Sequence, residues 1–329
     1  MIAEKDFNSL IEKERKIINA KLKKVLAKRK PRSLYEPSDY ILADQGKRLR
    51  PLLVLFAAKA VGGNYKQAYN AALAVEMLHN FTLVHDDIMD NADKRRNKLT
   101  VHVKYDVNTA ILAGDGLLAV AYEYLLKDLI VPGNEVAQYF TKGLVEVCEG
   151  QSLDKEFELE SSVTIADYLT MITKKTAAMV EMCCAIGAKI GGGSSDEVNA
   201  LACYGKYLGI AFQIQDDLLD IIGDEKEFGK KIGGDLIEGK KTFLFLKALT
   251  KAKGKERTAL QKVIINKGIK STEVENYKML YKKLGVLSDA QKEIASYTKR
   301  ALRQLIYIKN IQENELFTFI AHSLIKRTY

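Results

Sequence analysis

The hydrophobic and polar positions of the chain follow a helical period along most of its length. Apolar runs with helical spacing cover residues 67–90 and lead into residues 212–220, and charged amphipathic patterns cover residues 1–30 and the region after residue 250. Alternating β-branched runs are scarce, and no proline follows Pro132. The pattern therefore predicts an all-α fold, and we expect residues 1–329 to form a single domain.

The first of these apolar runs ends in a group of aspartates, Asp86, Asp87 and Asp90. Residues four apart on a helix point within about 40° of each other, so Asp86 and Asp90 share one face. Paired carboxylates suit Mg²⁺, which usually keeps several waters and binds phosphate oxygens as well. Taken alone, an acidic pattern of this length is also typical of a solvated turn.

The second apolar run repeats the same spacing, since Asp216, Asp217 and Asp220 end the segment that begins at Phe212. A repeat at the end of another helical run favours a metal-binding function over a solvated turn. Gln213 lies on the same stripe as these aspartates by the three-and-four rule.

Basic residues accompany both acidic motifs. Arg95 and Arg96 follow the first motif, and Lys47 and Arg50 lie one turn apart before a helix that Pro51 can begin. His79 lies on the stripe of Asp86, although a single helical histidine is also typical of packing. The other basic segments include Lys175 with Thr176 in a helix that begins near Thr164, and Lys230 to Lys240 in a glycine-spaced loop. We interpret the acidic and basic groups together as a site for metal-bridged phosphates.

Composition adds weaker constraints. The net charge of +9 arises from 51 basic and 42 acidic residues and mildly favours anionic partners, but the basic runs lack interleaved aromatics, so we expect no nucleic-acid partner. The four cysteines lie in apolar helical contexts without paired spacing, so we expect buried free thiols. With no apolar leader at the N-terminus and no long uncharged apolar stretch, we expect a cytoplasmic protein without a transmembrane segment.

The order of these motifs resembles that of the trans-isoprenyl diphosphate synthases in the polyprenyl synthetase family. The matching landmarks span residues 45–242. They are Gly46 to Pro51, His85 to Asp90, Arg95 with Arg96, Gly150 with Gln151, Lys175 with Thr176, Phe212 to Asp220, and Gly229 with Lys230 through Lys240 to Thr242.

The resemblance implies an isoprenoid synthase fold, a large helical bundle around a deep central cavity, normally as a homodimer. It also implies three Mg²⁺ ions in each active site. Asp86 and Asp90 would bind two of them and Asp216 the third, while Asp87, Asp217 and Asp220 would support them through hydrogen bonds or water.

The implied reaction joins isopentenyl diphosphate head to tail to an allylic diphosphate, namely dimethylallyl, geranyl or farnesyl diphosphate. By position, the allylic diphosphate would be held by Arg95, Lys175, Lys230 and Lys240. Isopentenyl diphosphate would be held by Lys47, Arg50, His79 and Arg96. Thr176 and Gln213 would lie along the reacting carbons, where their oxygen dipoles would steady the carbocation without trapping it.

In the family, the residues four and five positions before the first aspartate help to set product length, and here these are Thr82 and Phe81. The aromatic ring of Phe81 is similar to that of short-chain synthases of the geranylgeranyl type, so we expect mainly a C20 product, with C15 or a longer polyprenyl chain as alternatives. A terpene cyclase is disfavoured by the second aspartate motif, and a non-catalytic prenyltransferase subunit is disfavoured because both motifs are intact.

The chain departs from the family pattern at one position and matches it only loosely at another. Asn97 stands where the family usually has glycine, which leaves the geometry of that turn open. Lys326 and Arg327 in the basic tail correspond only loosely to the closing residues of the family.

Overall fold

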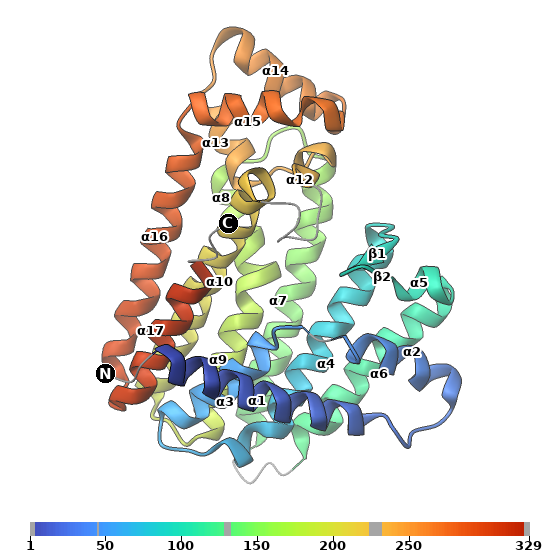
Figure 1. Cartoon of the computed structure of the whole chain (residues 1–329), viewed down its shortest axis with the longest axis vertical. Helices are drawn as coiled ribbons and strands as arrows, with labels where there is room; N and C mark the ends of the chain where they lie inside the picture. The colour runs from blue at the N-terminus through green and yellow to red at the C-terminus, as the bar shows by residue number, and fades with distance from the viewer. Residues whose placement is uncertain (1–3, 45, 128–132, 224–231, 326–329) are drawn as a thin grey trace. The chain divides into compact units, whose positions relative to one another are not determined.

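The computed structural model describes residues 4–44, 46–127, 133–223 and 232–325, and nearly all of these residues belong to helices or the short turns between them (Figure 1). The described residues group into two compact units. Unit 1 comprises residues 1–142, 182–202 and 306–319, and unit 2 comprises residues 143–181, 203–305 and 320–329. The predicted all-α class is confirmed, whereas the prediction of a single domain stays a prediction.

Unit 1 contains the N-terminal helices and a short hairpin. The elements are α1 (Glu4–Val25), α2 (Arg32–Leu42), α3 (Leu49–Ala60), α4 (Tyr65–Met89), β1 (Lys94–Arg95), β2 (Lys98–Leu99), α5 (Val101–Lys104) and α6 (Val107–Leu126). The first turns of α7 (Gly133–Leu159) and α10 (Ser195–Ile222), together with most of α9 (Ala178–Ile190) and α17 (Ile311–Ile325), complete it.

Unit 2 contains the remainder of those shared helices and a set of shorter ones. The additional elements are α8 (Ile165–Ile172), a π-helical turn η1 (Thr173–Ala177), α12 (Gly234–Ile237), α13 (Phe243–Lys251), α14 (Gly254–Ile265), η2 (Ser271–Glu273), α15 (Val274–Lys283) and α16 (Val286–Gln304). The 3₁₀ turn η3 (Leu305–Tyr307) precedes α17.

Local sequence explains where the helix with the first aspartate motif begins. The Asn64 side chain accepts hydrogen bonds from the backbone N–H groups of Lys66 and Gln67, and the Gln67 side chain accepts one from the Asn64 N–H in return. This capping box satisfies backbone donors that the first helical turn leaves without partners. The helix predicted over residues 67–90 is thereby confirmed within two residues at its start.

Packing in unit 1 is tightest where α4 meets α6. The buried face of α6 carries small and apolar residues, including Ala110, Ala113, Gly114 and Leu117, which allow a close approach to α4. By length and composition α6 resembles a membrane span, but its packing against α2, α4 and α5 identifies it as a core helix. Helix α3 is apolar on almost every side and correspondingly buried.

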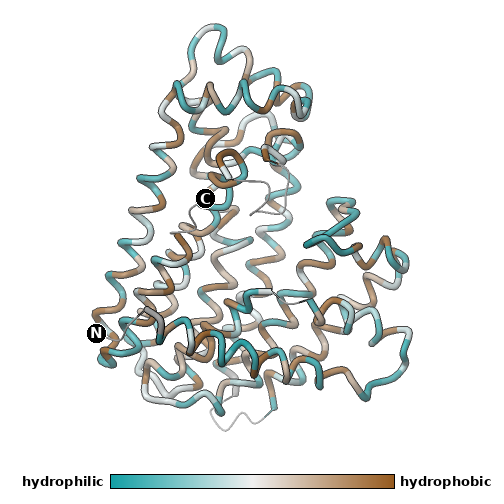
Figure 2. Tube along the Cα trace, in the orientation of Figure 1, coloured by the Kyte–Doolittle hydropathy of each residue, from teal (hydrophilic) through white to brown (hydrophobic). Residues whose placement is uncertain are grey.

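The core of unit 2 is built from large aromatic side chains. Tyr168, Phe243, Phe245 and Tyr281 are almost completely buried and belong to one hydrophobic cluster. The amphipathic pattern of α16 presents Val286 and further residues of one stripe to this cluster, and polar and apolar residues alternate along the helices (Figure 2). This core supports α8, the π-helical turn and the part of α10 that carries the second aspartate motif.

A glycine and a capping pair define the turn between α9 and α10. Gly192 has a positive φ of 82° just after α9, and Ser194 and Glu197 form reciprocal hydrogen bonds at the start of α10. The expectation for the cysteines is confirmed only in part, because all four are free but Cys148 is exposed.

Candidate active site

The first aspartate motif occupies the C-terminal end of α4. Asp86 is partly buried and Asp90, the C-cap residue, is exposed, and the two lie one helical turn apart. Asp87, the residue after Asp86, is only 6% exposed. Its Oδ1 accepts a hydrogen bond of 2.8 Å from Nε of Arg95. Burial raises the pKa of the Asp87 carboxyl, and the Arg95 charge partly opposes that shift.

A two-residue hairpin carries the arginine pair that follows this motif. Strands β1 and β2 pair antiparallel, and the two turn residues Arg96 and Asn97 have positive φ angles of 50° and 65°. Positive φ at both central positions is the type I′ geometry, which favours asparagine and glycine. Asn97 therefore suits the position at which the family usually has glycine, which answers the question of geometry that the sequence left open.

The hairpin also brings Arg96 to the segment before α3. Nη1 of Arg96 donates to Oδ2 of Asp44 over 2.7 Å. A Cβ atom added to Gly46 would lie 2.8 Å from the same nitrogen. The structure thus places Arg96 against the Gly46 to Pro51 segment, which also contains the predicted anion-binding residues Lys47, exposed, and Arg50, partly buried.

His79 lies beside Arg50, as its stripe on α4 predicted. Nη1 of Arg50 is 3.2 Å from Nε2 of His79. Burial lowers the pKa of His79 well below its usual value, and the charge of Arg50 lowers it further. This shift favours the neutral imidazole, whose Nε2 can accept a hydrogen bond from the Arg50 guanidinium.

Arg48, which lies between the predicted ligands Lys47 and Arg50, has a structural role that its sequence position did not predict. Its side chain is 5% exposed and forms an ion pair with the buried Glu76. It also donates to the Asn19 side chain over 2.8 Å and to the Leu42 carbonyl over 2.9 Å. Arg48 has a left-handed backbone with φ 52° at the start of α3. The buried contacts of Arg48 stabilise the segment that carries Lys47 and Arg50. The sequence offered one indication of this role: Lys47 and Arg50 lie one helical turn apart, and Arg48 does not share their face.

The predicted product-length residues lie on α4 below Asp86. The ring of Phe81 packs edge-on against the His85 ring with centroids 4.6 Å apart. The Thr82 hydroxyl donates to the His79 carbonyl over 2.8 Å. A Cβ atom on Gly114 of α6 would approach the His85 ring to 2.6 Å, so the glycine makes room for the ring pair.

In unit 2, a π-helical turn carries Lys175 and Thr176. A Cβ atom added to Gly150 of α7 would lie 2.1 Å from the Lys175 nitrogen, and one added to Gly209 of α10 would lie 2.6 Å from Cα of Ala177. The turn therefore packs closely against α7 and α10, at one glycine of each helix. π-Helical turns are rare and are frequent at functional sites.

Each of the two residues on this turn has a defined polar partner. Nζ of Lys175 forms an ion pair with Asp154 of α7. The Thr176 hydroxyl donates to Oε1 of Gln213 over 2.8 Å. The predicted association of Thr176 with Gln213 is therefore present in the structure, although their roles in a reaction stay predictions.

The second aspartate motif lies on α10, where Asp217 is the most buried member at 4% exposure. Its carboxylate accepts hydrogen bonds from the Tyr168 hydroxyl, the Gln213 amide and the Phe243 N–H. Burial raises the pKa of Asp217, which the negative charge of Asp235 reinforces. Asp216 is partly buried.

Asp220, also partly buried, joins the motif to the segment before α13. Its carbonyl accepts a hydrogen bond of 2.7 Å from the Gly233 N–H, and its side chain accepts one of 3.2 Å from the Asp235 N–H. Lys240 lies close by in sequence and forms ion pairs with Glu238 at 2.7 Å and with Asp235 at 3.8 Å. Lys230 and the tail residues Lys326 and Arg327 lie outside the described residues.

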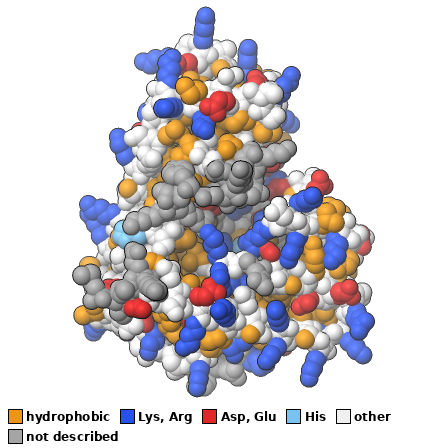
Figure 3. Space-filling view, in the orientation of Figure 1, with side chains coloured by type: hydrophobic (Ala, Val, Ile, Leu, Met, Phe, Trp, Pro, Cys, Tyr) orange, Lys and Arg blue, Asp and Glu red, His pale blue; other side chains and the backbone are white. Residues whose placement is uncertain are grey.

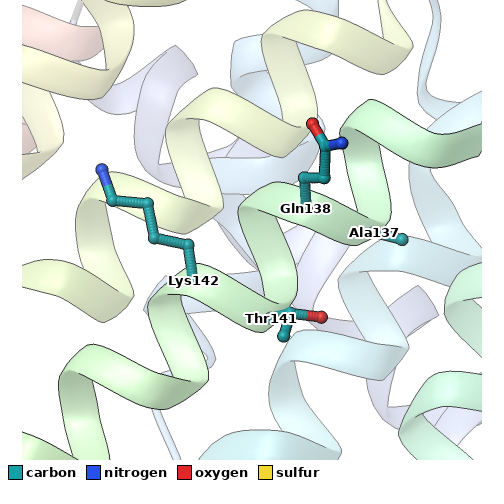
Figure 4. A pocket seen from close by; sticks show the side chains of 4 residues that line it. All are labelled: Ala137, Gln138, Thr141 and Lys142. Carbon is teal, nitrogen blue, oxygen red and sulfur yellow. The ribbon is translucent and has the colours of Figure 1, made fainter.

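Two surface depressions formed by described residues lie elsewhere. One of about 370 Å³ on α7 is lined by Ala137, Gln138, Thr141 and Lys142 (Figure 4). Another of about 470 Å³ in unit 2 is lined in part by Lys174, Lys206, Tyr207 and Arg300. Neither includes a predicted site residue, so the candidate site is identified by its side-chain chemistry. Lys and Arg side chains are scattered over the face shown in Figure 3.

Within the described residues, no group of three or more His, Cys, Asp or Glu side chains forms a ready metal cage. The donor set nevertheless fits Mg²⁺. Hard carboxylate oxygens are its preferred protein ligands, and it usually takes its remaining ligands from water and substrate phosphates. Asp86 and Asp90, one turn apart at the exposed end of α4, have the spacing for such a partial set.

Comparison with known proteins agrees with these features. The sequence profile of the family described as "Polyprenyl synthetase" matches residues 31–284. The chain belongs to this family. A polyprenyl synthetase relative, the geranylgeranyl pyrophosphate synthase of Geoglobus acetivorans, is 37% identical over 326 residues, which are 98% of this chain and 99% of that protein.

Two solved structures of this family have the same fold. The geranylgeranyl pyrophosphate synthetase of Pyrococcus horikoshii is 36% identical with a TM-score of 0.92, and the alignment covers 98% of this chain and 99% of that one. The polyprenyl synthase of Caulobacter crescentus, solved with calcium and isoprenyl diphosphate, is 26% identical with a TM-score of 0.90, covering 99% and 98%. The predicted isoprenoid synthase fold is confirmed.

Proposed function

We propose that the chain is a Mg²⁺-dependent prenyltransferase that condenses isopentenyl diphosphate head to tail with allylic diphosphates, chiefly to a C20 prenyl diphosphate. Its family membership and its full-length similarity to geranylgeranyl diphosphate synthases support this assignment. The observation that carries it is that both aspartate motifs are intact, each with its outer carboxylates on one face of a helix. Family membership supports the use of a divalent metal, and three Mg²⁺ ions for each site are part of the proposal.

The chemistry explains why these residue types are needed. Ionisation of an allylic diphosphate creates a carbocation and a highly charged leaving group. Bound Mg²⁺ would neutralise the developing charge on the diphosphate oxygens. The outer aspartates Asp86, Asp90 and Asp216 would hold the metal, whereas Asp87 and Asp217, whose oxygens accept hydrogen bonds from neighbouring side chains, would brace the helices. Asp220 would assist through its contact with the segment before α13.

The cationic residues divide between the two substrates. Arg95, Lys175, Lys230 and Lys240 would bind the allylic diphosphate, and Lys47, Arg50, His79 and Arg96 would bind isopentenyl diphosphate. The contacts of Arg96 with Asp44 and of Arg50 with His79 support the second group. An arriving diphosphate would replace Asp44 as the anionic partner of Arg96. It would also favour protonation of His79 by opposing the nearby arginine charges.

The alkene of isopentenyl diphosphate attacks the cation, and the released diphosphate takes the final proton. No side-chain nucleophile is required. Thr176 and Gln213 would face the reacting carbons with oxygen atoms, which stabilise positive charge without forming a bond. Water must be excluded while the cation exists, because it would capture the cation as an alcohol.

The proposed function is tested by incubating the purified chain with Mg²⁺, isopentenyl diphosphate and each allylic diphosphate in turn. We expect chelator-sensitive formation of a prenyl diphosphate, with C20 as the main product by chromatography. Absence of condensation with dimethylallyl, geranyl and farnesyl diphosphate would contradict the proposal. Products of 30 carbons or more would contradict only the short-chain assignment.

Product length depends in this proposal on the ring of Phe81, which would close the space available to the growing chain. Phe81→Ala removes the ring and should shift the product distribution toward longer chains. Thr82→Ala, which changes a smaller neighbouring side chain, serves as the matched control. Unchanged product lengths in Phe81→Ala would contradict this role.

We also propose that the chain forms a homodimer in the cytoplasm. On α6, the apolar side chains of Val107, Ile111 and Leu112 are 47%, 38% and 61% exposed, although the opposite face of the helix is packed in unit 1. An exposed apolar stripe on a core helix suits a protein–protein contact. Light scattering should give a dimer mass for the wild type and a monomer mass for Leu112→Glu, and a monomeric wild type would contradict the assignment.

A further inference from the structure

The Thr176 hydroxyl is the end of a chain of hydrogen bonds that starts in the core of unit 2. The Tyr168 hydroxyl donates to Oδ2 of Asp217 over 2.6 Å. Nε2 of Gln213 donates to Oδ1 of the same carboxylate over 3.0 Å. The Thr176 hydroxyl donates to Oε1 of Gln213 over 2.8 Å. The chain thus connects a buried tyrosine on α8 with the π-helical turn through two residues of α10.

Each link fixes the polarity of the next. A glutamine amide has a donor end and an acceptor end. With Asp217 ionised, the opposite orientation of Gln213 would set its oxygen against an Asp217 oxygen at the 3.0 Å contact. Because Nε2 of Gln213 donates to Asp217, Oε1 of the same amide faces Thr176. A hydroxyl has a single proton, and Thr176 directs that proton to Gln213. The Thr176 oxygen therefore presents lone pairs, and no proton, in its other directions.

Tyr168 is placed to keep this arrangement fixed. It is 2% exposed, and its ring packs against Phe243 with centroids 6.3 Å apart, so its hydroxyl has little freedom to move. Together with the Phe243 N–H, which donates to Oδ2 over 3.2 Å, it holds one carboxylate oxygen of Asp217 and turns the other toward Gln213. In a site this buried, water cannot readily replace a lost donor.

We propose that Tyr168 is a positioning residue of the condensation reaction, which acts through Asp217 and Gln213 to fix the Thr176 hydroxyl as an acceptor toward the reacting carbons. The inference rests on the proposed function and adds a residue to it. A carbocation is stabilised by oxygen lone pairs and opposed by a hydroxyl proton. Loss of the first link frees the carboxylate, the amide and finally the hydroxyl to rotate, so cation formation becomes slower while substrate binding is unchanged.

The first test compares Tyr168→Phe with Tyr277→Phe. The Tyr277 hydroxyl donates to the Ala259 carbonyl over 3.2 Å in the same unit, so the control loses a tyrosine hydrogen bond outside the chain described above. We expect Tyr168→Phe to lower kcat by about tenfold, with KM for both substrates within about twofold of wild type. Tyr277→Phe should leave both parameters unchanged.

The second test is a double-mutant cycle with Thr176→Val, which keeps the shape of the side chain and removes the hydroxyl. Once that hydroxyl is absent, Tyr168 has nothing to orient, so the double variant should have the kcat of Thr176→Val within about twofold. A merely structural tyrosine would give losses that multiply. If Tyr168→Phe does not fold, Asp217→Asn breaks the chain at its next link and completes the same cycle.

The outcomes separate the two proposals. Condensation by wild type with an unchanged kcat in Tyr168→Phe, or multiplied losses in the cycle, would overturn the positioning role alone. No condensation by the wild type would overturn the proposed function and, with it, a role for Tyr168 in that reaction. A loss of kcat confined to Tyr168→Phe, with a non-additive cycle, supports the inference.

Discussion

The two aspartate motifs have the same spacing but are built into different surroundings. The first lies at the end of α4, where Asp90 is an exposed cap residue and a two-residue hairpin follows. The second lies within α10, which continues to Ile222, and the segment before α13 donates backbone N–H groups to Asp220. The carboxylates of the first motif, at a helix end, can therefore adjust their positions more freely than those of the second motif, which neighbouring backbone groups hold in place.

In both motifs the middle aspartate is buried and hydrogen-bonded. Asp87 and Asp217 are 6% and 4% exposed, and each has a specific donor, Arg95 in one case and Tyr168 in the other. Successive residues on a helix are turned by about 100°, so the spacing that aligns the outer pair must direct the middle residue elsewhere. In the proposed function, one sequence pattern would therefore combine two outer carboxylates that hold the metal with a buried carboxylate that braces the helix.

The largest expected effect comes from the outer carboxylates. Asp86→Asn and Asp216→Asn each remove a charge that would hold the metal, so each should lower kcat by about a thousandfold or more. Melting temperature and circular dichroism should stay close to wild type, because neither residue is a fully buried brace. Near-normal turnover by either variant would break the assignment of that motif.

The next effect tests the rigid surroundings of the second motif. In Gly150→Ala the new methyl group would meet the Lys175 backbone at 2.1 Å and displace the π-helical turn. We expect a loss of kcat of about a hundredfold and a loss of unfolding free energy of about 3 kcal/mol. Gly116→Ala on α6 is the control, since its methyl group would meet only the flexible Leu34 side chain at 3.1 Å. Equal results for both variants would contradict this account of the turn.

The middle aspartates should differ in stability. Asp217→Asn places an amide group against three donors, and we expect a loss of unfolding free energy of about 2 kcal/mol in the metal-free protein. Asp87→Asn weakens a pair with Arg95, whose side chain is 36% exposed, and should cost below about 1 kcal/mol. Urea denaturation measures the unfolding free energy of both variants. A larger loss in Asp87→Asn than in Asp217→Asn would contradict the proposed difference between the two aspartates.

The smallest effect concerns the hairpin. Because Asn97 already has φ 65°, Asn97→Gly should change unfolding free energy by no more than about 0.5 kcal/mol and leave turnover unchanged. Asn97→Val puts a β-branched residue in a left-handed conformation and should cost about 1–2 kcal/mol. A large loss of activity in Asn97→Gly would show that the asparagine side chain has a role beyond the turn.

Sequence periodicity sufficed for the long elements, because apolar spacing and caps such as Asn64 with Gln67 specify a helix locally. It also placed Asp86 and Asp90 on one face of a helix, whereas the association of Thr176 with Gln213 came from the family resemblance. It did not reveal the π-helical turn, which one inserted residue creates and which depends on Gly150 and Gly209 of distant helices. Arg48 and Tyr168 were missed for a related reason, since their partners lie 28 and 49 residues away.

The central claim, that outer aspartates bind the metal-bridged diphosphate and middle aspartates brace the helices, is tested most directly by calorimetric titration. The ligand is a thio analogue of farnesyl diphosphate that does not ionise, added with Mg²⁺ to wild type and to Asp86→Asn, Asp216→Asn, Asp87→Asn and Asp217→Asn. We predict that both outer variants lose at least about tenfold in Mg²⁺-dependent affinity while both middle variants stay within about threefold of wild type. Equal losses in outer and middle variants would contradict the division of roles.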